Sequence, residues 1–126
     1  MQSDKSSPMG DMTVPTTDAD ALAAQIDAEE PVTLLDVRMH DEFETWHIDG
    51  PAVNAINIPY IEFLNGEVPA SASEALPADE QVTVICAKGG SSEFVAAVLA
   101  DAGYDVNHLE DGMQGWARVY ERREID

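Results

Sequence analysis

The sequence has little cysteine, little positive charge and no long hydrophobic run. Its 126 residues include a single cysteine, Cys86, so no internal disulfide can form and nothing points to an oxidising compartment. No run of about 18 apolar residues occurs, and the N-terminus lacks the basic-then-apolar pattern of a signal peptide. We therefore expect a cytoplasmic protein without membrane association, in one domain large enough to form a core.

Positive charge is scarce throughout the chain. Six Lys and Arg residues stand against 25 Asp and Glu residues, which gives a formal net charge of −19. The acids are spread along the chain, which favours an acidic folded surface over a disordered acidic tail. Such a surface repels nucleic acid and anionic membranes. We expect a source with a salt-rich cytoplasm, where screening makes dense acidic charge tolerable, and keep an ordinary acidic protein as the alternative.

The sequence also lacks the spacings typical of metal sites and phosphate-binding loops. The three histidines, His40, His47 and His108, are scattered and form no ligand pattern with Cys86. The glycine-rich segment after Cys86 does not end in the Gly-Lys-Ser/Thr of a Walker loop. Neither a metal site nor a cofactor is predicted.

The most informative stretch surrounds Cys86. Residues Val82 to Ile85 predict a short buried strand, and Gly89 and Gly90 allow a tight loop after it. Residues 91–100 predict a helix. Its candidate caps are Ser91 and Ser92, and its expected apolar face comprises Phe94, Val95, Val98 and Leu99.

Cys86 is therefore expected where a strand ends and a helix begins. There the N–H groups of the loop and of the helix N-terminus converge, and they stabilise an anion such as a thiolate. Lys88 adds a positive charge. A lone cysteine is usually an inert buried side chain. A packing cysteine needs no glycines behind it, however, so the context favours a nucleophile.

The rest of the chain predicts strands alternating with helices. Residues 1–14 are expected to be a disordered leader, and Thr17 with Asp20 should form the capping box of a first helix that opens over residues 15–20. Further strands are expected over 32–37, 55–58 and 105–109, further helices over 40–46 and 60–64, and a loop with room for one helical turn over 65–80. Residues 112–116 are expected to lead into a final helix that ends in the charged residues 121–126. The alternation implies an α/β fold, with one mostly parallel sheet covered by helices on both faces. Ligands in such sheets bind at the carboxyl ends of the strands, where Cys86 falls.

Four segments together resemble the rhodanese domain family over about residues 15–120. They are Leu34-Leu-Asp-Val-Arg38 with Glu42-Phe43, His47-Ile-Asp-Gly50 leading to Asn57-Ile-Pro59, the Cys86 loop, and Leu109 through Gly112-Met113 and Gly115-Trp116. The resemblance implies a rhodanese-like domain over 15–121, with residues 122–126 as a candidate linker. It also implies structural support from Asp36 and Arg38, with Glu42 as a further candidate. Trp46, His47 and Trp116 are interpreted as packing residues.

The chemistry implied by the resemblance is sulfur transfer, as in thiosulfate:cyanide sulfurtransferases. Cys86 would be the catalytic nucleophile that carries a persulfide. The surrounding substrate-binding loop would comprise Ala87, Lys88, Gly89, Gly90, Ser91 and Ser92. The expected partners are a small sulfur donor, either thiosulfate or a persulfide, and cyanide, a thiol, or another domain or protein as acceptor.

The loop departs from one common version of the family, which has arginine where this chain has Ser91. Lys88 alone would then attract thiosulfate, and the missing arginine argues against phosphatase or arsenate reductase chemistry. A second hypothesis is a rhodanese-like sulfur-carrier or regulatory module joined to another enzyme domain, such as a metallo-hydrolase. The presence of Cys86 favours the enzyme.

Overall fold

The computed structural model describes residues 14–125, with side chains described for residues 14–119. Its centre is a five-stranded parallel sheet in the order β1-β5-β4-β2-β3. The strands are β1 (Thr16–Thr17), β2 (Val32–Asp36), β3 (Val53–Asn57), β4 (Val82–Ile85) and β5 (Val106–Leu109). The helices are α2 (Ala19–Asp27), α3 (His40–Thr45), η1 (Tyr60–Phe63), α4 (Ala70–Ala75), α5 (Gly90–Asp101) and α6 (Gly112–Ile125). The α/β fold with a parallel sheet, expected from the sequence, is confirmed.

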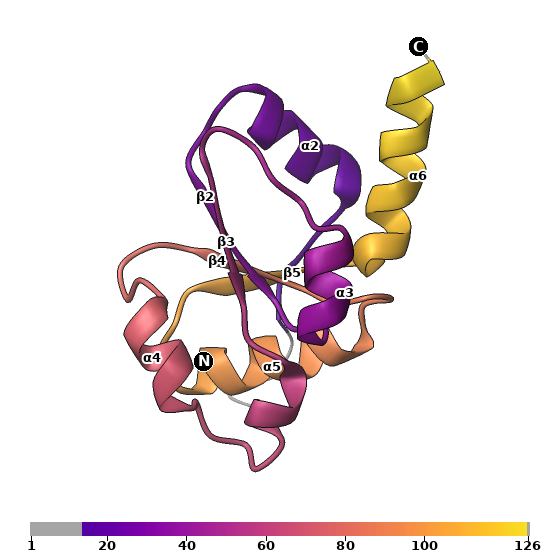
Figure 1. Ribbon diagram of the computed structural model, residues 1–126. Helices are drawn as coiled ribbons and strands as arrows, with labels where there is room; N and C mark the ends of the chain where they lie inside the picture. Colours follow the sequence, from indigo (N-terminus) through magenta and orange to yellow (C-terminus); the bar gives the residue numbers. More distant parts are fainter. Residues whose placement is uncertain (1–13, 126) are drawn as a thin grey trace, which may run out of the picture.

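Helices cover both faces of the sheet. Figure 1 shows α2 and α6 on one side, and α4 and α5 on the other. Successive residues of a strand point to opposite faces, so Val82, Val84 and Cys86 join the core under α5, whereas Ile85 joins the core under α2 and α6. Every residue of β4 is therefore buried, which explains its continuous run of apolar and β-branched residues.

The start of the described chain differs from its prediction. Helix α2 is capped by Asp18, whose Oδ1 accepts a hydrogen bond of 2.8 Å from the N–H of Ala21, so the predicted Thr17 box is wrong. Thr17 instead pairs with Leu109 in the parallel sheet. The predicted leader lies outside the described residues except for Val14, which is buried in the core.

Helix α5 also departs from its prediction in two respects. Its N-cap is Gly89, so the prediction that Ser91 or Ser92 caps it is wrong. Phe94 is 41% exposed, because the buried stripe of the helix is one position out of phase with the predicted face. That stripe comprises Ser92, Val95, Ala96 and Leu99.

The aromatic residues expected to pack do so unequally. Trp116 is buried among α2 and α6, and the His47 ring stacks on Phe43 with a centroid separation of 3.9 Å. Trp46 is 37% exposed, so its assignment to the core is wrong. It follows the last residue of α3 in extended backbone, and none of the residues of α3 itself is buried.

Two further helices can be compared with the predicted bounds. Helix α6 continues to Ile125, past the expected domain end at residue 121. The stretch expected to be mostly loop contains the short helix α4. Within residues 14–125, no helix combines the length and apolar character that crossing a membrane requires.

Candidate active site

Cys86 lies directly after β4, at the carboxyl edge of the sheet, and is 4% exposed. The backbone N–H of Gly89 donates to its sulfur at 2.9 Å. Gly89 has a φ of 112°, and a Cβ added there would lie 2.3 Å from the carbonyl oxygen of Glu110. Only glycine fits this conformation and this contact. The local sequence thus directs a backbone donor at the sulfur, where it stabilises negative charge.

A second group of contacts connects the sulfur to the interior. Ser92, which is 0% exposed, accepts from the Cys86 Sγ at 3.4 Å and donates through Oγ to the Gly89 carbonyl oxygen at 3.0 Å. The Nδ1 atom of His108, on β5, lies 3.2 Å from the same Ser92 Oγ. The site therefore contains a buried histidine that the sequence analysis did not assign to it. The available signal was a polar residue two positions after the inward-facing Val106.

Among the described residues, the other members of the predicted loop form no hydrogen bond with the sulfur. Ala87, Lys88 and Gly90 are exposed and Ser91 is half-buried. Among the described residues, only the N–H of Gly89 and the hydroxyl of Ser92 hydrogen-bond with Cys86 Sγ. Substrate binding by the remaining loop residues stays a prediction.

The start of α6 forms backbone hydrogen bonds with the Cys86 loop. The N–H of Met113 donates to the carbonyl oxygen of Cys86 at 2.8 Å, and that of Gln114 donates to the carbonyl oxygen of Ala87 at 3.0 Å. Gly112 has a φ of 58°, and a Cβ there would lie 2.4 Å from the Cys86 carbonyl oxygen. The glycine therefore allows the two backbones to approach closely enough for these hydrogen bonds.

The predicted support residues Asp36 and Arg38 form an ion pair after β2. Arg38 donates to both carboxylate oxygens, with a shortest distance of 2.7 Å, and to the Trp46 carbonyl oxygen, also at 2.7 Å. The pair is buried and connects the end of β2 to the end of α3. Glu42 is not bonded to Arg38; its side chain accepts from the N–H of Met39 at 3.2 Å. A supporting role for these residues stays a prediction.

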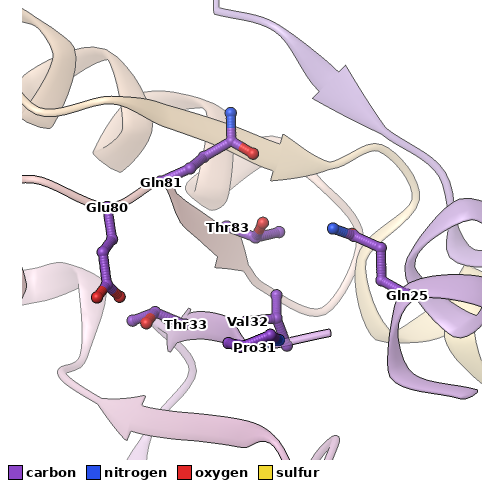
Figure 2. Close-up of a pocket in the computed structure, with 7 residues that line it drawn as sticks. All are labelled: Gln25, Pro31, Val32, Thr33, Glu80, Gln81 and Thr83. Carbon is purple, nitrogen blue, oxygen red and sulfur yellow. The ribbon is translucent and has the colours of Figure 1, made fainter. Parts of the chain in front are cut away.

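A surface hollow lies at the opposite edge of the sheet, at the amino ends of β2 and β4 (Figure 2). It is lined by Gln25, Pro31, Val32, Thr33, Glu80, Gln81 and Thr83. None of these is a cysteine, histidine or basic residue, and Thr83 already donates to Asn107 at 2.7 Å. Within the described residues, no group of three or more His, Cys, Asp or Glu could hold a metal ion. The hollow is therefore not the candidate active site.

A buried cysteine at the carboxyl end of a parallel strand, with a backbone N–H directed at its sulfur, defines an α/β protein with a candidate cysteine nucleophile. The family model of the rhodanese-like domain matches residues 18–119. The chain belongs to this family.

The names of similar proteins include both sulfur carriers and sulfurtransferases. The putative sulfur carrier protein YrkF of Bacillus subtilis is 31% identical over 104 residues, covering 82% of this chain and 51% of YrkF. Thiosulfate sulfurtransferase GlpE of Actinobacillus succinogenes is 35% identical over 91 residues, covering 71% of this chain and 73% of GlpE. A solved rhodanese-related protein from Thermoplasma volcanium has 32% identity and a TM-score of 0.62, with 82% of this chain and 91% of that chain covered. This chain thus spans about half the length of YrkF.

Proposed function

We propose that this protein is a sulfurtransferase that carries a sulfane sulfur as a persulfide on Cys86. The observation that carries the proposal is the hydrogen bond of 2.9 Å from the Gly89 N–H to the Cys86 sulfur. A donor in this position stabilises both a thiolate and the anionic persulfide formed from it. Membership of the rhodanese-like family and similarity to GlpE support the same reaction.

The proposed reaction has two displacement steps. The Cys86 thiolate attacks the outer sulfur of thiosulfate, the S–S bond of the donor breaks, and sulfite leaves with the bonding electron pair. Cyanide or a thiolate then attacks the outer sulfur of the persulfide and releases thiocyanate or a new persulfide, which regenerates the Cys86 thiolate. No oxidant, reductant or cofactor enters either step, since both are nucleophilic displacements at sulfur.

The first prediction tests Cys86 directly. Treatment with thiosulfate should raise the intact mass by one sulfur, about 32 Da, on Cys86, and cyanide should remove the added mass. Cys86→Ser should show no gain and no thiocyanate formation, because a hydroxyl cannot carry a persulfide. A matching melting temperature for the variant is the control for folding. Thiocyanate formation by Cys86→Ser at the wild-type rate would disprove the mechanism.

A sulfur-carrier module is the second candidate. It is favoured by the similarity to YrkF, of which this chain spans 51%. A carrier would gain the persulfide but would pass the sulfur to a protein acceptor and not to cyanide. A gain in mass without thiocyanate formation would therefore favour the carrier. A gain in mass together with thiocyanate formation would favour the enzyme.

A further inference from the structure

The Ser92 hydroxyl has three neighbours but only one proton to share among them. Its Oγ lies 3.0 Å from the Gly89 carbonyl oxygen, 3.4 Å from Cys86 Sγ and 3.2 Å from His108 Nδ1. The carbonyl oxygen can only accept, so it accepts a hydrogen bond from the Ser92 hydroxyl, while the Cys86 thiol donates to Oγ. His108 Nδ1 must then be the second donor to Oγ, which defines its tautomer as the one with hydrogen on Nδ1.

We propose that His108 is a positioning residue, which acts through Ser92 to direct a hydroxyl donor at the Cys86 sulfur when that sulfur is negatively charged. On ionisation the thiol proton leaves to water and the sulfur becomes an acceptor. Ser92 keeps its own proton and turns it from the Gly89 carbonyl to the thiolate. With His108 donating to Oγ, the hydroxyl cannot turn toward the ring, and its donation is strengthened by the hydrogen bond it receives.

The change of partner does not leave the Gly89 carbonyl oxygen without a hydrogen bond. The Gly89 carbonyl oxygen also accepts from the Glu93 N–H at 3.2 Å, so it remains paired when the Ser92 proton turns away. The sulfur then receives two donors, the N–H of Gly89 and the O–H of Ser92. Both stabilise a thiolate and, equally, a persulfide anion.

The fold holds His108 firmly in this place. β4 and β5 pair in parallel with Val84 opposite His108, and the inward alternation places the His108 ring under α5, where Ser92 lies. His108 is 5% exposed, so bulk water cannot readily replace its donor. The polar chain thus connects three elements, namely the end of β4, the first turn of α5 and β5.

Other charged groups near the network are either exposed or already paired. Lys88, Glu93 and Glu110 are exposed, Asp111 pairs with Arg118, and Asp36 pairs with Arg38. None of them has a described hydrogen bond to Ser92, His108 or the sulfur. A pH effect transmitted by His108 should therefore depend on Ser92.

The test is the pH dependence of Cys86 alkylation by iodoacetamide, which reports on one site because the chain has one cysteine. His108→Asn retains an N–H donor at the position of Nδ1, whereas His108→Gln places its amide one carbon further away. We expect the Asn variant to follow the wild-type profile. The Gln variant should react about fivefold more slowly near neutral pH and reach the wild-type rate at high pH, since it loses only assistance to the thiolate.

The same comparison in a Ser92→Ala background separates positioning from general support of the fold. If His108 acts through Ser92, then His108→Gln should have no further effect on alkylation once Ser92 is removed. An equal effect in both backgrounds, a wild-type profile for His108→Gln, or equal damage by Asn and Gln would each overturn the proposal.

Alkylation needs no sulfur donor, so this test is independent of the proposed sulfur transfer. Only a kinetic extension rests on that function: His108→Gln should lower kcat/KM for thiosulfate in the same proportion as the alkylation rate. A chain that never gains a sulfur would refute the proposed function and leave the alkylation result intact.

Discussion

Two kinds of residue near Cys86 can interact with negative charge: buried hydrogen-bond donors beside the sulfur, and one exposed lysine. The Gly89 N–H reaches the sulfur at 2.9 Å, and the buried Ser92 hydroxyl lies beside it. Lys88 is exposed and forms no ion pair within the part of the chain described here. Because an arginine is absent at Ser91, Lys88 is the basic side chain of the loop. Lys88 should attract an anionic sulfur donor such as thiosulfate, whereas the buried N–H and hydroxyl groups should stabilise negative charge on the Cys86 sulfur.

Replacement of Lys88 tests this division. Lys88→Ala should raise the KM for thiosulfate by up to about fivefold, since an exposed charge contact contributes at most about 1 kcal/mol. The KM for a neutral thiol acceptor should change less. Lys88→Arg retains the charge and is the matched control. An unchanged KM for thiosulfate in Lys88→Ala would mean that backbone N–H groups alone bind the donor.

Among the elements, α6 and β4 determine the position of the Cys86 loop. The first turn of α6 donates two backbone hydrogen bonds to the carbonyl groups of Cys86 and Ala87. Gly112 makes this possible, because any side chain there would meet the loop backbone. The segment at Gly112 that resembles the rhodanese family therefore has a physical role in this fold, which is the close approach of a helix start to the Cys86 loop.

A pair of glycine substitutions isolates this close approach. Gly112 and Gly66 both have positive φ values, 58° and 81°, but a Cβ at Gly66 would meet nothing within 4 Å. Gly66→Ala should cost only the backbone strain, about 1 kcal/mol of unfolding free energy. Gly112→Ala should cost clearly more and should slow alkylation of Cys86, since the loop must move. Equal losses of stability for the two variants in denaturant unfolding would contradict this role.

The whole molecule carries a net charge that the proposed site does not explain. A formal net charge of −19 on 126 residues produces self-repulsion that opposes the compact state. The proposed site contains little of this charge, because its central groups are a thiol, a hydroxyl, an imidazole and backbone amides. Salt should therefore act mainly on the stability of the fold and only weakly on the chemistry.

Melting in salt tests this expectation. Raising KCl from about 0.1 M to about 2 M should raise the melting temperature, since the screening length falls to about 3 Å near 1 M. The same salt screens Lys88 from thiosulfate, but that loss is at most about 1 kcal/mol. KM measured at both concentrations separates the two effects. A melting temperature that stays level or falls would leave an ordinary acidic protein and exclude the salt-adapted interpretation.

Local patterns in the sequence were sufficient for the architecture and for the place of Cys86 in it. The apolar run of β4, the glycines after Cys86 and the helix that follows are all encoded within residues 82–101, and the alternation of such units predicts a parallel sheet. The structure contains each of these elements, with Cys86 at the carboxyl edge of the sheet. Burial on both faces is visible in the composition of β4 itself, so no knowledge of its neighbours was needed.

Contacts between distant segments were decided only by the tertiary structure. His108 meets Ser92 because β5 pairs with β4 in one particular register, and Thr17 leaves its predicted capping box because it pairs with β5. The exposure of Trp46 and Phe94 likewise depends on which neighbouring elements cover them. A sequence pattern states that a face is apolar or that a residue can donate. Which group it meets is determined by strand register and helix packing, because these bring together side chains that are far apart in the chain.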